Sequence, residues 1–178
     1  MDQSIDLTAL DRAIDAHAEA AFAFLERLVA APSTVGQEQG ALEVFASELA
    51  GLGFAIERLP VTEDVTSRPN AGVRQAPYAG RYNVLARRDG DRARPSLLLN
   101  GHIDVVPADS PQLWTTPPFQ PARRDGWLHG RGAGDMKCGF AMGTLALHAI
   151  RDVAPEALSA PVSFLAAIEE ECTGNGTI

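Results

Sequence analysis

The sequence predicts an α/β fold in which a mixed, largely parallel sheet is flanked by helices. Stretches with helical periodicity alternate with short apolar runs along the chain, which is the pattern of such folds. The chain has 178 residues, 46% of them hydrophobic and 21% charged, and is long enough for one domain with a sizeable core. Two of the apolar runs lead directly into polar side chains, as strands of α/β sheets do at their carboxyl ends.

Helices are predicted where apolar residues recur at steps of three and four, and strands where short apolar or alternating runs meet turn residues. Pro32 is expected to end the first helix, and Gly51 and Gly53 the second. Residues 61–80 lack periodicity and are predicted to be a loop. The predicted elements are helices at 7–30, 37–52 and 137–151, the last apolar nearly all round, and strands at 54–59, 82–86, 96–100, 127–129 and 162–168.

The composition argues against several classes of protein. The formal net charge is −8 and basic residues are interleaved with acidic ones, so we expect no nucleic-acid partner. The two cysteines, Cys138 and Cys172, form no C-x-x-C pair, which argues against a disulfide scaffold and favours a reducing cytoplasm. The N-terminus has no basic region followed by an apolar run, and no apolar stretch approaches about 18 residues. We therefore expect neither a signal peptide nor a membrane span.

The strand at 96–100 leads into His102 and Asp104 through the sequence S-L-L-L-N-G-H-I-D. Because they lie two residues apart on an extended segment, both side chains point the same way. A metal-bound imidazole needs its second ring nitrogen held, and a carboxylate does this while raising the basicity of the ring. The pair alone is a weak signal that fits an ordinary histidine at a strand end better than a ligand, so other motifs must decide.

A glycine-rich stretch, G-R-G-A-G-D-M-K at 130–137, places Asp135 after three glycines and ahead of the third predicted helix. Glycine backbone allows a loop to pass close to a ligand or a metal ion. The rival interpretation is a phosphate-binding loop of a nucleotide-binding α/β domain, although the stretch lacks the third glycine of the dinucleotide fingerprint. Both interpretations stay open on this motif alone.

Three consecutive acids, Glu169, Glu170 and Glu171, follow the apolar strand at 162–168. A charge run is most often a solvated turn. This run, however, comes where α/β sheets place their sites, beyond the carboxyl end of a buried strand. Neighbouring glutamates can divide the work there, one binding a metal ion and the next removing a proton from water.

Together these motifs resemble the zinc-dependent amidohydrolase and exopeptidase family of acetylornithine deacetylase, succinyl-diaminopimelate desuccinylase, aminoacylase and glutamate carboxypeptidase. The motifs are H-I-D-V-V-P at 102–107, G-R-G-A-G-D-M-K at 130–137 and E-E-E-C-T-G-N-G at 169–176. Their order matches the family, as do the intervals, and the resemblance extends to V-A-A-P-S at 29–33. It implies a zinc-exopeptidase-like catalytic fold and hydrolysis of an amide bond in an N-acyl amino acid or a small peptide.

The resemblance implies a role for each matching residue. His102 would bind one metal ion, with Asp104 as the carboxylate that orients it. Asp135 would bridge two metal ions, and Glu171 would bind the second. Glu170 would be the general base, taking a proton from the attacking water and returning it to the leaving amine. The implied cofactors are two divalent ions, zinc first, with cobalt or manganese accepted by the same ligand types.

The chain departs from the family pattern at two positions. Glu169 stands where the family more often has Asp, and Cys138 where it more often has Gly, and neither change removes a ligand. Cys138 and Cys172 lie near the site as soft donors or as small packing residues, and we favour packing. The resemblance also implies a cis peptide bond between Asp135 and Met136.

Two family ligands have no counterpart here: an acidic residue beyond the acidic run, and a histidine near the end of the catalytic domain. The smaller domain that carries the dimer contact and helps to close over substrate is also absent. Residues 1–178 are therefore expected to be the N-terminal portion of a catalytic domain whose full-length enzyme is a homodimer. We expect this chain alone to bind fewer metal ions and to be poorly active. The alternative is a non-catalytic truncated domain that acts as an interaction module.

Overall fold

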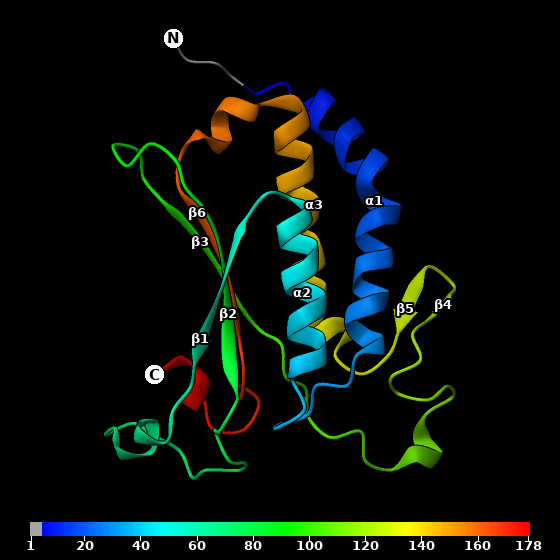
Figure 1. Ribbon diagram of the computed structural model, residues 1–178. Coiled ribbons are helices and arrows are strands. Elements are labelled where there is room, and N and C mark those ends of the chain that lie inside the picture. The colour runs from blue at the N-terminus through cyan, green and yellow to red at the C-terminus, as the bar shows by residue number, and fades with distance from the viewer. Residues whose placement is uncertain (1–4) are drawn as a thin grey trace.

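The structure, a computed structural model, describes residues 5–178; the first four, part of the N-terminus in which we expect no signal peptide, lie outside this range. Within it, three α-helices lie on one face of a four-stranded sheet, and a small hairpin lies beside the first helix (Figure 1). The helices are α1 (Leu7–Ala30), α2 (Gln39–Gly51) and α3 (Cys138–Val153), and the strands are β1 (Ala55–Pro60), β2 (Tyr82–Arg88), β3 (Leu97–His102), β4 (Ala122–Arg124), β5 (Trp127–His129) and β6 (Val162–Ala167).

The bounds of the first helix follow from the residues at its two ends, Asp6 and Pro32. The carboxylate of Asp6 accepts the backbone N–H groups of Thr8 and Ala9 at 2.9 and 3.1 Å, which satisfies two donors that the helix itself leaves free. The helix stops at Ala30, two residues before Pro32, as predicted. The predicted bounds of α2 and α3 are likewise within two residues of those observed.

The sheet has the strand order β1-β2-β6-β3. β2 pairs antiparallel with both β1 and β6, whereas β3 and β6 run parallel. The prediction of a mixed sheet flanked by helices is therefore confirmed. Its largely parallel character is wrong for the described strands, because only one of these three pairings is parallel. Parallel strands must be joined by a long crossover connection, which usually contains a helix. In this sheet β3 and β6 are joined in this way, by the segment that contains α3.

An aromatic cluster joins the helices to the sheet. Phe45 of α2, Phe140 of α3 and Phe164 of β6 are each at most 3% exposed, and their ring centroids lie 5.0 to 5.4 Å apart. The third helix is buried on most sides, as its sequence predicted: most of its residues are buried or half-buried, although Met142 is 61% exposed. Leu98 on the edge strand β3 is 59% exposed, so some apolar side chains of the sheet are uncovered.

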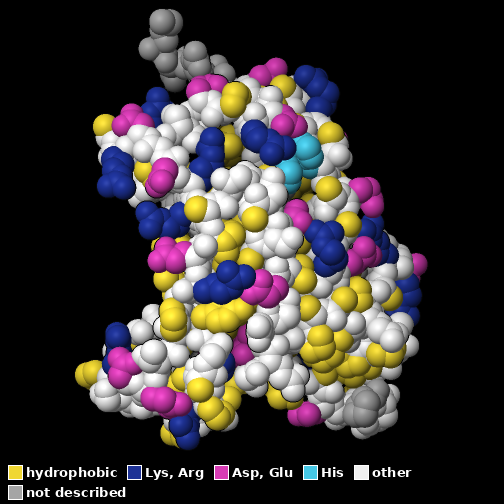
Figure 2. Space-filling model, in the orientation of Figure 1, with side chains coloured by type: hydrophobic (Ala, Val, Ile, Leu, Met, Phe, Trp, Pro, Cys, Tyr) yellow, Lys and Arg dark blue, Asp and Glu magenta, His cyan; other side chains and the backbone are white. Residues whose placement is uncertain are grey.

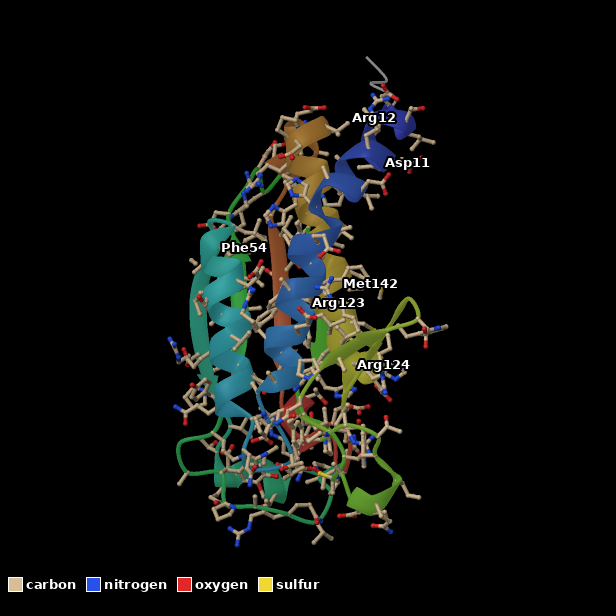
Figure 3. All side chains as sticks on the ribbon, turned by 90° about the vertical axis from the view of Figure 1, so that its right-hand side faces the viewer. Asp11, Arg12, Phe54, Arg123, Arg124 and Met142 are labelled. Carbon is tan, nitrogen blue, oxygen red and sulfur yellow. The ribbon has the colours of Figure 1, made fainter. Side chains whose placement is uncertain are left out.

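The side chain of Arg123 links the β4–β5 hairpin to α1. Arg123 bonds Glu19 and Glu26 at 2.8 Å each, and Figure 3 shows it beside α1. β4 was not predicted, and neither was the short 3₁₀ helix Glu63–Ser67 inside the predicted loop. Both elements are too short to show a periodic pattern in the sequence: β4 has three residues, and the 3₁₀ helix is about one turn long.

On the face shown in Figure 2, basic and acidic side chains are interspersed, and its described residues form no continuous basic patch. Among the described helices, none combines the length and apolar character needed to span a bilayer.

Candidate metal centre

The parallel pairing of β3 and β6 sets up the site. In this pairing His102 lies opposite Ala167, and the N–H of Ile103 donates to the carbonyl of Ala167 at 2.8 Å. The carboxyl ends of the two strands therefore meet at one edge of the sheet, and the polar residues that follow them come together. This is how residues from the first and third motifs, about 70 positions apart, become neighbours.

The second motif reaches the same edge through the irregular turn Ala133–Lys137 that precedes α3. The peptide bond between Asp135 and Met136 is cis, as the family resemblance implied. Gly101 of β3 leaves room for this turn: a Cβ there would lie 2.7 Å from the Met136 methyl carbon. Gly132 has φ of 79°, a conformation that favours glycine, and a Cβ there would meet the Val105 side chain at 2.4 Å. The glycines thus allow close packing of the turn.

The three predicted metal ligands converge. His102, Asp135 and Glu171 each offer one ligand atom, and these atoms all lie within 4.8 Å of one another. His102 Nε2 is 3.3 Å from the Asp135 carboxylate and 3.6 Å from that of Glu170, the predicted base. The Asp135 side chain is 80% exposed and that of Glu170 52%, so one side of the cluster is open to solvent.

The ring of His102 is oriented so that Nε2 faces this cluster. Its Nδ1 lies 3.0 Å from the backbone carbonyl oxygen of Asp104, which can only accept a hydrogen bond. In the neutral ring Nδ1 is therefore the donor, which leaves the lone pair of Nε2 for a cation. The Asp104 carboxylate is 3.6 Å from Nδ1, farther than the carbonyl oxygen of the same residue.

Negative charge accumulates around this single imidazole. The pKa of Glu171 is raised, first by its burial and then by the negative charge of Asp135. Crowded carboxylates that resist ionisation together are stabilised as a group by a bound cation.

The buried carboxylate of Asp104 organises the acidic run. It has no exposed surface, and its two oxygens accept the backbone N–H groups of Glu170 and Glu171 at 3.0 Å each. The residue thus connects the end of β3 to the turn that carries the predicted base and the predicted third ligand. These two hydrogen bonds have no signal in the sequence, because they depend on the sheet register.

Replacing Asp104 with asparagine should lower the free energy of unfolding by about 1–3 kcal/mol, because one partly buried N–H then faces an amide nitrogen that cannot accept. Urea denaturation at pH 7 measures this difference. Asp89→Asn is the matched control: the Asp89 side chain is 90% exposed, and we expect a change within about 0.5 kcal/mol. Equal effects of the two substitutions would contradict the role given to Asp104.

Lys137 anchors the turn that carries Asp135. It is fully buried, and its Nζ donates to the carbonyl oxygens of Leu28 and Ala31, at 2.7 and 3.0 Å, where α1 ends. Burial lowers the pKa of Lys137 to about 8. Lys137 ends the glycine-rich motif at 130–137, and its anchoring role was not predicted from the sequence.

Three further observations concern residues near the cluster. Glu169, which the solvated-turn interpretation would expose, is completely buried. The thiol of Cys138 lies 3.0 Å from the carbonyl oxygen of Gly134, and the described group of possible ligands contains no cysteine. Burial raises the pKa of Cys172, which disfavours the thiolate that a metal would need.

Comparisons with known proteins agree with this geometry. Residues 98–178 match the model of peptidase family M20/M25/M40. The succinyl-diaminopimelate desuccinylase of Paracidovorax citrulli is 38% identical over 152 residues, which cover 85% of this chain and 36% of that protein. The enzyme of the same name from Delftia acidovorans is 39% identical over 147 residues, covering 82% and 34%. The chain thus spans about a third of the length of these curated relatives.

Solved structures show the same fold. The di-peptidase Dug1p of Saccharomyces cerevisiae superposes with a TM-score of 0.75 at 19% identity, covering 95% of this chain and 36% of that one. Human carnosine dipeptidase 1 gives 0.67 at 26% identity, covering 92% and 35%. All five predicted site residues lie in the segment that matches the family model. Residues 98–178 are thus part of a domain of peptidase family M20/M25/M40.

Proposed function

We propose that this chain supplies part of the catalytic centre of a metal-dependent hydrolase that cleaves an amide bond in an N-acyl amino acid or a small peptide. The observation that carries the proposal is the convergence of His102, Asp135 and Glu171 within 4.8 Å, with Glu170 beside them. The names of the relatives, desuccinylases and dipeptidases, support a substrate of this class.

The residues present fit a divalent cation. His102, Asp135 and Glu171 offer one imidazole nitrogen and two carboxylates, a donor set suited to zinc and also to cobalt or manganese. In our proposal the complete centre would hold two ions, with Asp135 among their ligands; a solved M20 peptidase from Bacillus subtilis, 18% identical, is described as dinuclear. Bound there, the ions supply Lewis acidity that polarises the amide carbonyl and makes water easier to deprotonate.

The chain's own residues supply the proton transfer. Glu170 is half-exposed and faces the same space as His102 Nε2, so it can reach both the cluster and solvent. In our proposal it takes the proton of the attacking water and returns it to the leaving amine. Asp104 fixes the backbone that carries Glu170, and its carbonyl oxygen holds the imidazole.

We propose that the 178-residue chain alone is poorly active and binds fewer than two ions, since it provides three direct ligands. The longer enzyme to which it corresponds is proposed to be a cytoplasmic homodimer without nucleic-acid or membrane partners. The second candidate, an interaction module that has lost catalysis, is favoured only by the incomplete ligand set among the described residues.

A hydrolysis assay on the zinc-loaded chain tests the proposal. We expect slow release of free amine from an N-succinyl amino acid, followed by mass spectrometry over hours and corrected for zinc in buffer. The rate should disappear with a chelator, return with added zinc, and fall by about 10²–10⁴-fold in Glu170→Gln. Glu156→Gln, which changes an exposed residue outside the site, is the control.

The outcomes separate the two candidates. A rate that a chelator leaves unchanged, or one that is equal in Glu170→Gln, would contradict metal-dependent catalysis by this centre. Zinc binding without any release of amine would favour the interaction module.

A further inference from the structure

The first glutamate of the acidic run is the centre of a buried polar network. The Glu169 carboxylate accepts hydrogen bonds from the Tyr78 hydroxyl at 2.9 Å, from Arg81 Nη1 at 2.5 Å and from the Thr173 hydroxyl at 2.8 Å. Asn175 in turn donates to the Tyr78 hydroxyl at 2.7 Å. The three residues that bond Glu169 directly all lie outside the helices and strands, so the network holds segments that the sheet pairing does not.

Arg81 joins two buried carboxylates with one planar group. Its Nη2 bonds Glu38, immediately before α2, at 2.5 Å, while its Nη1 bonds Glu169. The side chains are 9% exposed for Arg81, 2% for Glu38 and none for Glu169. The guanidinium also lies over the Tyr78 ring, 5.3 Å from its centroid. A lysine offers a single point charge, which cannot reproduce this forked arrangement.

The network continues directly into the candidate site. Glu169 has φ of 63°, an uncommon conformation for a residue other than glycine, at the point where the chain leaves β6. The next two N–H groups, those of Glu170 and Glu171, donate to Asp104. The turn is therefore held from both ends, by Arg81 through the Glu169 side chain and by Asp104 through the backbone.

We propose that Arg81 is a positioning residue for the candidate centre: by holding Glu169, it sets the backbone from which Glu170 and Glu171 project. The inference rests on the proposed function for its meaning, because Glu170 and Glu171 are the proposed base and ligand. The structural part of the proposal, that Arg81 holds the turn in place, does not depend on catalysis.

The chain contains a matched control triad of the same residue types. Arg58 bonds Glu43 at 2.7 Å, and Tyr82 donates to Glu43 at 2.7 Å, which repeats the Arg–Glu–Tyr chemistry of the network. This triad is half-exposed and links β1 and β2 to α2. Its contacts do not include the turn after β6, so a change there should leave the turn unaffected.

Amide hydrogen exchange, resolved by residue with NMR on the metal-free chain, tests the proposal. In Arg81→Lys we expect the amides of Glu170 and Glu171 to exchange about tenfold faster or more, while those of Phe164 and Leu165 in β6 change less than about threefold. Arg58→Lys should leave all four unchanged. Tyr78→Phe, which keeps the ring and removes one hydrogen bond to Glu169, should accelerate the same two amides severalfold.

Two results would overturn the proposal: unchanged exchange at Glu170 and Glu171, or acceleration spread evenly over β6, which would make Arg81 a general stability residue. If Arg81→Lys does not fold, Tyr78→Phe decides by the same criteria. Because the readout needs neither metal nor turnover, failure of the hydrolase proposal and failure of this one are distinguishable.

Discussion

Replacing Asp135 with alanine is expected to weaken zinc binding by more than about 100-fold, the largest effect on the site. The loss of an orienting partner alone typically costs 10–100-fold in metal affinity, and Asp135 is placed to contact the metal directly. Removing it leaves His102 and Glu171, too few donors for a stable site. Elemental analysis after dialysis against trace zinc, on the chain and on the variant, measures the difference.

Asp89→Ala serves as the control for this experiment, since Asp89 is also an aspartate but is 90% exposed and contacts no residue of the cluster. It should retain the zinc content of the unmodified chain. Equal zinc in Asp135→Ala and the unmodified chain would mean that the ion is held elsewhere, and would remove the basis of the proposed centre.

The largest expected effect on stability is that of Phe140→Ala, which should lower the free energy of unfolding by about 3–5 kcal/mol. Phe140 has no exposed surface and contacts the rings of Phe45 and Phe164. Its loss leaves a cavity between the helix layer and the sheet, where those rings cannot close the gap without moving the backbone of both layers. Chemical denaturation followed by circular dichroism measures the change.

Phe22→Ala is the comparison for this prediction. Phe22 is also on a helix but is 41% exposed, so truncating it should cost about 1 kcal/mol or less. If both substitutions cost the same, the aromatic cluster would not be the centre of the core. The prediction also bears on the site, because Phe140 lies in α3, which the Asp135 turn directly precedes.

The sequence alone was sufficient to predict the elements whose pattern involves only residues close together in the chain. The 24 residues of α1 repeat their apolar pattern over several turns, and Pro32 marks its end. β6 could be read from a run of apolar residues bounded by Pro161 and the acidic run. These signals depend only on near neighbours in the chain, so no knowledge of the fold is needed to use them.

The sheet order could not be read in the same way. β6 lies between β2 and β3 although nearly 60 residues separate it from β3 in sequence, and the antiparallel β2–β6 pairing has no local signature. Strand direction is decided by which crossover the intervening chain permits, and short irregular segments give no periodicity from which to infer it.

The structure brings together three residues that the sequence motifs singled out, His102, Asp135 and Glu171, and their roles as ligands stay predictions. Each stands within a motif beside a recognisable strand or helix. Arg81 and Glu38 were missed, because they stand in stretches without a motif and acquire their roles only when distant loops meet. A buried pair of this kind can be identified only from its partners in space.

The wide separation of the three converging side chains along the chain has a thermodynamic consequence. They meet only after β3 and β6 have paired and α3 has packed, so a cation that needs all three recognises the folded chain and not the unfolded one. Binding and folding are then linked by mass action: at a free metal concentration 100 times the Kd, the folded state gains about 2.7 kcal/mol. For a chain of marginal stability, the supply of metal sets the fraction of molecules that are folded.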